Sequence, residues 1–276
     1  MLQRTLIAKN KNMKIKNQFL TLGLVLFMTT IATAQKEFKV PVQNNKDGKL
    51  TLIEFSGDVP IEGYSGNEII ITGEARKPDN SERAKGLKPI YPGGDDNTGI
   101  ALYMEKNGNQ VTFRCLLPIT HGQGDYKIKV PENFKIEVEN ECAKGRKVTV
   151  KNIKNEIEIK NCMDVDLRNV TGPVVVSTIS GDVTVVFTEL NVDKPLSLAS
   201  ISGDIDITLP AKAGVDVDMS TMNGTIYSDF DFPAKKDETK MKKIGGGGGV
   251  KNELNGGGVS LKVTNISGNI YLRKGK

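Results

Sequence analysis

Two aspartates stand at equivalent places in a repeated turn and could together do chemistry. Asp182 and Asp204 each end a Ser-Gly-Asp triplet, and 22 residues separate them. If successive repeats stack as neighbouring strands, the two carboxylates lie about 4.8 Å apart. A pair that close could bind Ca²⁺ or serve a glycosidase-like reaction. The next copies carry Thr225 and Asn269 instead, so the pattern favours turn-forming aspartates over a catalytic or metal site.

The single histidine, His121, lies in a Thr-His-Gly-Gln-Gly segment at 120–124. One histidine cannot build the usual multi-histidine metal site, and no Gly-x-Ser-x-Gly elbow accompanies it. The sequence therefore predicts a surface histidine in a loop. No catalytic residue, metal ligand or cofactor-binding residue is assigned.

Three cysteines, Cys115, Cys142 and Cys162, form an odd set. Cys142 and Cys162 lie 20 residues apart, close to one repeat, so adjacent turns could bring their Cα atoms within the disulfide range of about 4.4–6.8 Å. Two interpretations stay open: a bridge, which an exported protein permits, or small buried thiols. Cys115, beside Leu116 and Leu117, is expected in the core in either case.

A lysine-rich segment precedes the longest glycine run, within residues 229–258. No Gly-Lys-Ser or Gly-Lys-Thr ends that run, so it is not a phosphate loop. The composition favours a mobile, solvated linker. The alternative is contact with an anionic glycan or lipid head group, although Asp237 and Glu238 interrupt the positive charge. The lysines are Lys235, Lys236, Lys240, Lys242 and Lys243.

These candidate residues belong to a pattern that the chain repeats. Apolar side chains fall seven, five and two residues before the centre of each turn, and two residues after it. Alternation on both sides is typical of strands, but the phase slips by one between the second and third apolar positions. We expect a bend or bulge that returns both to the core. Clear copies centre on Gly181, Gly203, Gly224 and Gly268, and weaker windows centre on Gly57, Asn155 and Gly172.

A period of 21 to 22 residues between the best copies is typical of repeat architectures. Tryptophan is absent and aromatic residues make up 5% of the chain, which favours an aliphatic core shared by stacked turns. We predict an all-β parallel β-solenoid, a single-stranded β-helix of roughly 20-residue repeats, in preference to an antiparallel meander or sandwich. Residues 35–75 are expected to form N-terminal β repeats, 76–100 a flexible loop or insertion, and 101–276 the main solenoid, interrupted by the insertion 229–258.

Residues 1–34 contain basic residues, then an apolar run, then a small-residue cleavage site before Gln35. This order predicts a secretory signal peptide, and the run is shorter than the about 20 residues that a membrane span needs. The five basic residues of this segment account for the whole formal net charge of +5. The mature chain is therefore expected to be neutral, exported to the periplasm or cell surface, not membrane-spanning, and without a nucleic-acid partner.

The turns also resemble a known family. Ile-Ser-Gly-Asp at 179–182 and 201–204 and Ile-Ser-Gly-Asn at 266–269, together with the signal peptide, are similar to the bacterial β-strand-repeat family of putative adhesins, a domain of unknown function. The resemblance covers roughly residues 140–276, with 55–59 as an outlying match. It implies surface attachment and brings no catalytic residues to transfer.

Three functional hypotheses follow. The first is a non-enzymatic exported cell-envelope protein, an adhesin-like binding module or scaffold whose partner is an envelope glycan or a surface protein. Its faces would present Asp216, Asp218, Lys262 and Thr264. The second is a structural polymer that self-assembles through unpaired strands at the solenoid ends, with 259–272 as the terminal strand. The third, least favoured, is a polysaccharide-active enzyme that uses Asp182 and Asp204.

Overall fold

The computed structural model describes part of the chain, and all that follows concerns those residues. The segment 1–34, with the predicted signal peptide, lies outside them, as do His121 and the five lysines named above. The described residues are 35–74, 82–87, 90–91, 93–117, 126–143, 145–190, 194–232 and 248–275.

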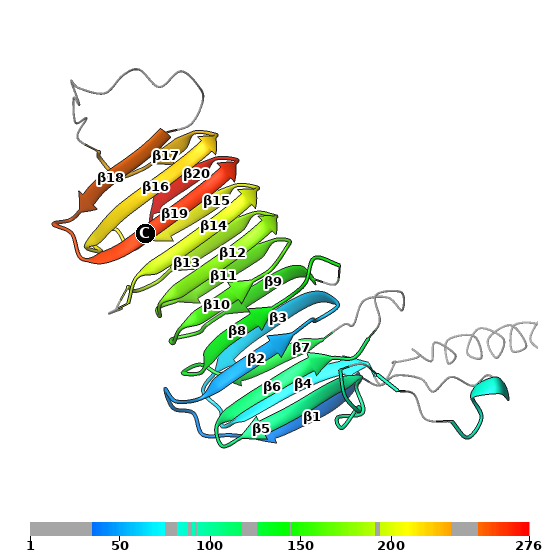
Figure 1. Ribbon diagram of the computed structural model, residues 1–276. Coiled ribbons are helices and arrows are strands. Elements are labelled where there is room, and N and C mark those ends of the chain that lie inside the picture. The colour runs from blue at the N-terminus through cyan, green and yellow to red at the C-terminus, as the bar shows by residue number, and fades with distance from the viewer. Residues whose placement is uncertain are drawn as a thin grey trace, which may run out of the picture. The chain divides into compact units, whose positions relative to one another are not determined.

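The described residues form two ten-stranded sheets that face each other across one core, with a single short 3₁₀ helix, η1 (Glu82–Ala84), outside them (Figure 1). Sheet 1 contains, in spatial order, β1 (Gln35–Pro41), β4 (Glu68–Glu74), β7 (Lys127–Pro131), β3 (Gly57–Tyr64), β9 (Gly145–Lys151), β11 (Val165–Val170), β13 (Val183–Phe187), β15 (Ile205–Leu209), β20 (Ile270–Lys274) and β17 (Ile226–Ser228). Sheet 2 contains β18 (Gly248–Leu254), β16 (Val215–Asn223), β19 (Val259–Ser267), β14 (Leu196–Ser202), β12 (Val174–Ser180), β10 (Ile157–Lys160), β8 (Lys135–Glu139), β2 (Lys49–Ile53), β6 (Gln110–Cys115) and β5 (Leu102–Asn107).

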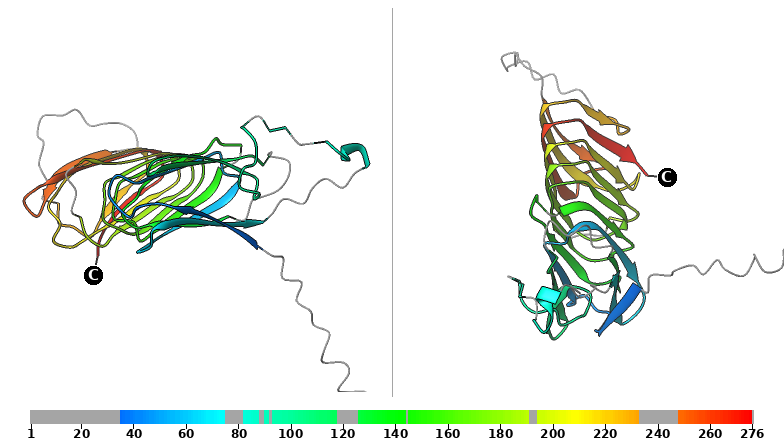
Figure 2. Two further views of the ribbon diagram at one scale, coloured as in Figure 1. Left: turned by 90° about the horizontal axis from the view of Figure 1, so that it is seen from below. Right: turned by 90° about the vertical axis from the view of Figure 1, so that its right-hand side faces the viewer.

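The repeating unit is a coil: one strand of sheet 2, a corner, and the next strand of sheet 1. Neighbouring coils pair in parallel in both sheets, as β12 does with β14 and β13 with β15 (Figure 2). The predicted all-β class is confirmed, and the central strands stack in parallel as expected. The sheets are nevertheless mixed, because β1, β4, β5 and β18 pair antiparallel at the two ends of the stack.

The coils do not stack in sequence order throughout, which corrects the expectation of consecutive turns. Coil β19–β20 lies between coils β14–β15 and β16–β17, although β16–β17 precedes it in the chain. At the other end, coil β2–β3 lies between β6–β7 and β8–β9. At the C-terminal end the chain therefore builds the outer coil first and then fills the place beside it. At the other end it builds the inner coil β2–β3 first, adds β6–β7 outside it, and then places β8–β9 on its other side.

The core between the sheets confirms three of the four apolar positions of the pattern. Positions seven and five before the centre are buried strand residues, such as Leu196 and Leu198. They belong to sheet 2 in five windows and to sheet 1 in the windows around Asn155 and Gly172. The position two after the centre lies in the next strand, in the facing sheet, where Ile205 and Ile270 are fully buried. This core is mostly aliphatic, as the composition predicts.

The remaining apolar position, two residues before the centre, is buried in three windows and exposed in the other four. In the windows around Gly57, Asn155 and Gly172, the residue two before the centre is buried: Phe55, Ile153 and Val170. Each follows a residue with positive φ, namely Glu54 (56°), Asn152 (59°) and Asn169 (55°). A left-handed residue turns the next side chain inward, which is the bend that the phase slip predicts.

The four clear copies lack this bend, and the expectation for them is wrong. Their strands continue the ordinary alternation, so the residue three before the glycine points inward and the residue two before it points outward. The outward residues are between 42% and 62% exposed. We call these four the outer row: Ile179, Ile201, Ile266 and Met222.

Candidate functional site

The aspartates singled out by the sequence build the corners of the stack. The backbone N–H of Asp204 donates to Asp182 Oδ1 at 2.8 Å, and the N–H of Asn269 donates to Asp204 Oδ1 at 2.7 Å. The series begins at Asp164, whose Oδ1 accepts from Asp182, and ends where Asn269 Oδ1 accepts from Thr225. We call these five residues the corner ladder. Each side-chain oxygen thus bonds to the next coil. The aspartates have a structural use, but their bonds run between coils, where the prediction was of local bonds within each turn.

The corner glycines are required because stacked corners approach closely. A Cβ placed on Gly203 would overlap the carbonyl of Gly181, and one on Gly268 would overlap the carbonyl of Gly203. Both glycines also have positive φ, 131° and 137°. The glycines are therefore explained mainly by backbone proximity between coils.

A row of buried polar side chains, which sequence reasoning missed, lies just inside the corners. Thr178 Oγ1 donates to the Met163 carbonyl at 2.9 Å, and Thr221 Oγ1 donates to the Gly268 carbonyl at 3.0 Å. Asn265 Nδ2 donates to the Gly203 carbonyl at 2.8 Å. Each bond satisfies a corner carbonyl of the adjacent coil, which burial would otherwise leave unpaired. The inner ladder consists of Asn140, Asn161, Thr178, Ser200, Asn265 and Thr221.

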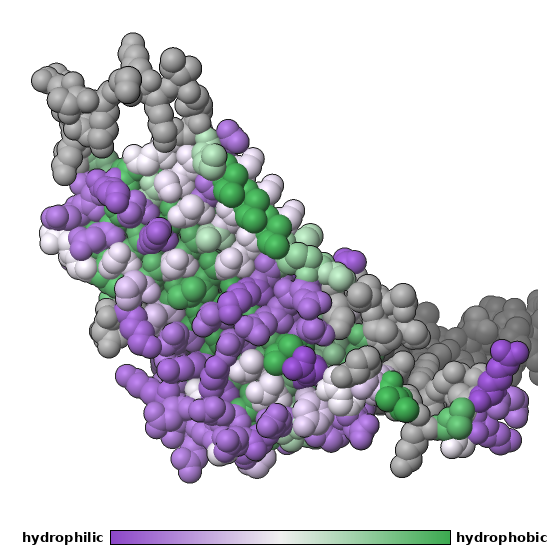
Figure 3. Space-filling model, viewed as in Figure 1, coloured by the Kyte–Doolittle hydropathy of each residue, from purple (hydrophilic) through white to green (hydrophobic). Residues whose placement is uncertain are grey.

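The outer row gathers apolar side chains on the surface. Because β12, β14, β19 and β16 pair in register, its four members fall on neighbouring strands. Figure 3 shows apolar side chains in a line along one edge of the C-terminal half of the stack. Contiguous exposed apolar side chains are a feature of interaction surfaces.

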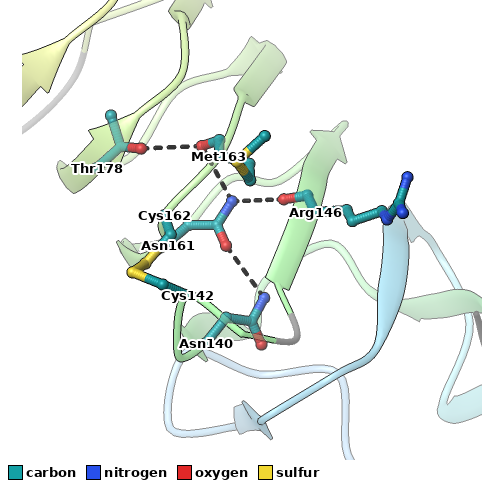
Figure 4. The surroundings of a disulfide bond; sticks show 7 residues. All are labelled: Asn140, Cys142, Arg146, Asn161, Cys162, Met163 and Thr178. Carbon is teal, nitrogen blue, oxygen red and sulfur yellow. Dashed lines mark hydrogen bonds between the residues drawn. A yellow bond between two sulfur atoms is a disulfide. The ribbon is translucent and has the colours of Figure 1, made fainter. Parts of the chain in front are cut away.

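The cysteine pair joins two adjacent coils. Cys142 and Cys162 form a disulfide with their Cα atoms 4.9 Å apart, so the bridged interpretation holds (Figure 4). Beside it, Asn140 Nδ2 donates to Asn161 Oδ1 at 3.3 Å, and Asn161 Nδ2 donates to the Arg146 carbonyl at 2.7 Å. The bridge therefore reinforces the inner ladder. Cys115 is a buried free thiol, as predicted.

Glu156, directly before β10, is paired with two lysines from other coils. Glu156 lies 2.7 Å from Lys194 and 3.7 Å from Lys135, measured between carboxylate oxygen and Nζ. The hydrogen bond from Lys194 lowers the pKa of the Glu156 carboxyl, although partial burial opposes it. This group links coils through charge and shows no sign of an acid kept protonated for chemistry.

A cluster on the outer surface of sheet 1 combines aromatic and charged groups. Tyr271 on β20 and Tyr227 on β17 are register partners whose rings stack 5.2 Å apart between centroids, at 10°. The Arg273 guanidinium lies 5.4 Å from the Tyr271 ring centroid. Arg273 Nε donates to both carboxylate oxygens of Asp206, at 2.8 and 2.9 Å, and this bond raises the pKa of Arg273.

A depression on the outer surface of sheet 2 is lined by charged side chains near β18. Its volume of about 520 Å³ falls within the range of small-molecule sites, which is roughly 300–1,000 Å³. The lining includes Asp216, Asp218 and Glu253, and Lys251 Nζ lies 2.8 Å from an Asp218 oxygen. Asp216 and Asp218 thus line a shared surface, as the sequence suggested, and Val217 is the one apolar residue of its lining.

The described ranges contain no group of three or more His, Cys, Asp or Glu placed to hold a metal ion. In the same ranges, no helix has the length and hydropathy that a membrane crossing requires.

The coils, each with one strand in each of the two mixed sheets, define an all-β repeat protein. The chain belongs to the Toastrack DUF4097 family, whose model matches residues 3–273. Two solved structures are similar. One is a putative cell adhesion protein from Clostridium sporogenes ATCC 15579, at 12% identity and a TM-score of 0.46, covering 87% of this chain and 100% of that one. The other is a putative adhesin from Bacteroides fragilis NCTC 9343, at 12% identity and a TM-score of 0.40, covering 88% of this chain and 98% of that one. No curated protein matches the sequence.

Proposed function

We propose that this chain is a non-enzymatic exported envelope protein that acts as an adhesin-like binding module. The observation that carries the proposal is the register of the outward side chains. On sheet 2, the row Ser177, Ala199, Thr264 and Ser220 runs beside the outer row, with one residue per coil. Neighbouring strands lie about 4.8 Å apart, so both rows are evenly spaced. The two rows bear small or apolar side chains. A regular face of this kind suits an extended partner such as an envelope polysaccharide.

The use of the corner carboxylates supports the non-enzymatic part of the proposal. A glycosidase needs two carboxyl groups that can reach the scissile bond, one to donate a proton and one to attack or activate water. Asp182 and Asp204 each accept a backbone hydrogen bond from the next coil instead. Their positions follow the demands of stacking.

Self-assembly remains an alternative hypothesis, but the ends of the stack give it little support. The outermost strands β1, β5 and β18 carry charged side chains, and β17 has only three residues. Short or charged edge strands oppose strand addition. The segment 259–272, expected to be terminal, forms β19 and most of β20 in the interior of the stack. Its removal would therefore disrupt the stack and could not test end-to-end assembly cleanly.

The test is a binding screen against envelope polysaccharides and envelope proteins. The protein would be expressed with its own N-terminal segment and purified after export, and its new N-terminus sequenced, with Gln35 expected. The screen would run with Ca²⁺ and with chelator, and released sugars would be measured in parallel. We expect binding without product release and without Ca²⁺ dependence. Sugar release that is lost in Asp204→Asn would contradict the proposal, as would failure to bind any envelope component.

A further inference from the structure

The outer surface of sheet 2 is uncharged on β12 and β14. The outward residues of these two strands are Val175, Ser177 and Ile179 on β12, and Ser197, Ala199 and Ile201 on β14. The strands on either side have charged outward residues, namely Glu158 and Lys160 on β10 and Lys262 on β19. An uncharged centre within a polar rim is the usual arrangement of a protein–protein interface.

The outer row has its centre between β14 and β19. The strands in this part of sheet 2 follow the spatial order β10, β12, β14, β19, β16 and β18, so three lie on each side of the centre (Figure 1). Ile201 and Ile266 are next to the centre, and Ile179 and Met222 lie one strand further out. A two-fold axis through the centre, parallel to the strands, reverses this order in a second copy. Ile201 then lies opposite Ile266 of the second copy, and Ile179 opposite Met222 of the second copy.

The same axis brings opposite charges together. Glu158 on β10 and Lys251 on β18 lie at the two ends of one row of outward residues, each on the third strand from the centre. The residues between them in this row are Val175, Ser197, Lys262 and Asp218. Glu158 of one copy therefore lies opposite Lys251 of the other, twice in a dimer. The Glu158 side chain is 40% exposed and the Lys251 side chain 79%, so both are accessible to a second copy.

We infer that the outer surface of sheet 2 binds a second copy of this chain, with the outer row packed against the same row of the copy about a two-fold axis between β14 and β19. Because a second copy has the same spacing of about 4.8 Å, every member of the row meets an apolar counterpart. A two-fold contact is complete after two copies, so it forms a dimer and no polymer. This inference rests on the proposed function, since it names the partner of that binding face: a copy of the protein instead of a polysaccharide.

The size of this face predicts a weak, reversible dimer. Six strands at about 4.8 Å, with three outward positions at about 6.7 Å on each, cover about 600 Å². Stable complexes bury about 800 Å² on each partner, and weak ones less. We therefore expect a dissociation constant in the micromolar range, so that the dimer forms where the protein is concentrated.

The first experiment measures the dimer by sedimentation equilibrium of the exported protein between about 1 and 500 μM. It compares the parent with Ile201→Asp and with the control Ile90→Asp, since Ile90 is 92% exposed and lies outside both sheets. The Ile201 variant should dimerise about 100-fold or more weakly, because the dimer would bury its carboxylate beside Ile266 of the second copy. The control should dimerise like the parent. Circular dichroism and thermal unfolding show whether each variant is folded.

The second experiment tests the two-fold register by reversing charges. Glu158→Lys alone and Lys251→Glu alone each place like charges opposite one another at two sites of the dimer. Each variant should therefore dimerise about tenfold or more weakly than the parent. An equimolar mixture of the two variants restores both opposite-charge pairs in a mixed dimer, which should form within about threefold of the parental affinity.

The outcomes separate this inference from the general function. A parent that stays monomeric at about 500 μM overturns the inference, and the binding function stands if the screen above identifies another envelope component. If the parent neither dimerises nor binds any such component, both proposals fail. A dimer that Ile201→Asp leaves intact uses another surface, which also overturns the inference. So does a mixture of the two charge variants that dimerises no better than either variant alone, because the register would then be wrong.

Discussion

The role of the corner ladder can be tested at Asp204, because the next coil has an asparagine at the equivalent position. Asn269 occupies the equivalent place one coil further on, and its Oδ1 accepts from the Thr225 N–H at 3.0 Å. An asparagine can therefore do at this corner what an aspartate does. Asp204→Asn should keep the bond to the Asn269 N–H, and Asp204→Ala should lose it.

The magnitude follows from the bond that is lost. A hydrogen bond to a charged group contributes about 1.5–3 kcal/mol and a neutral one about 0.5–1.5 kcal/mol. The Asp204 side chain is half-buried, so water replaces part of what the alanine variant loses. We expect Asp204→Ala to lower the free energy of unfolding by about 1–2 kcal/mol and Asp204→Asn by less than about 1 kcal/mol. At about 2–4 °C per kcal/mol for a chain of this size, the alanine variant should melt about 2–8 °C lower.

The assay is urea and thermal unfolding followed by circular dichroism, with and without Ca²⁺. Asp95→Ala, at an exposed aspartate outside the corner ladder, is the control and should be near neutral. The reasoning is refuted if Asp204→Asn costs as much as Asp204→Ala. It is also refuted if Ca²⁺ stabilises the parent but not the asparagine variant, because the carboxylate charge would then matter in itself.

Three further outcomes are expected. Leu198→Ala should lower the free energy of unfolding by about 2–5 kcal/mol, because Leu198 is buried. Ile201→Ala, three residues along the same strand, should lower it by less than about 1 kcal/mol. Equal losses in urea unfolding would show that the outer row is buried. Reducing the Cys142–Cys162 bridge should cost about 3 kcal/mol for its 20-residue separation, so a melting temperature unchanged by reductant would count against a structural role. The bonded lysine lowers the pKa of Glu156 in the folded state below its unfolded value. The carboxylate therefore stabilises the fold above about pH 4.5, and this contribution is lost as the pH falls through the folded-state pKa. Glu156→Gln should flatten that part of the curve of unfolding free energy against pH, and an unchanged curve would contradict the assignment.

The positions of the corners and most of the core could be read from the sequence because both depend on local chemistry. Small turn residues and period-two alternation suffice to place Leu198 inward and Gly203 at a corner. The outer row could not be placed by the same logic, since an isoleucine fits either face of a strand. The backbone conformation of the preceding residue decides whether this side chain points inward or outward. Asn152 adopts a left-handed backbone and turns its neighbour inward, but Asn265 stays in the strand and bonds a corner carbonyl, so residue type alone does not settle the matter.

The stacked tyrosine pair on sheet 1 could not be predicted from the chain for a different reason. Tyr227 and Tyr271 are 44 residues apart and meet only because coil β19–β20 lies beside coil β16–β17. Repeats with similar apolar faces offer similar pairing energies, and nothing local in such a sequence says which coil will be the neighbour of which. A consistent polar residue three before each central glycine was, by contrast, a readable signal of the inner ladder. Its members in the four clear copies are Thr178, Ser200, Thr221 and Asn265.

The placement of coil β19–β20 also sets the order in which the stack can be completed. An ideal solenoid can add its coils one after another as the chain becomes available. Here β16 pairs only with β18 and β19, and β17 pairs only with β20, all of which come later in the chain. Strands β16 and β17 can therefore join the stack only after β19 and β20 are available, and folding of the C-terminal end depends on this long-range pairing. If a protease removed β19 and β20, the three outer strands β16, β17 and β18 would also lose their attachment to the stack.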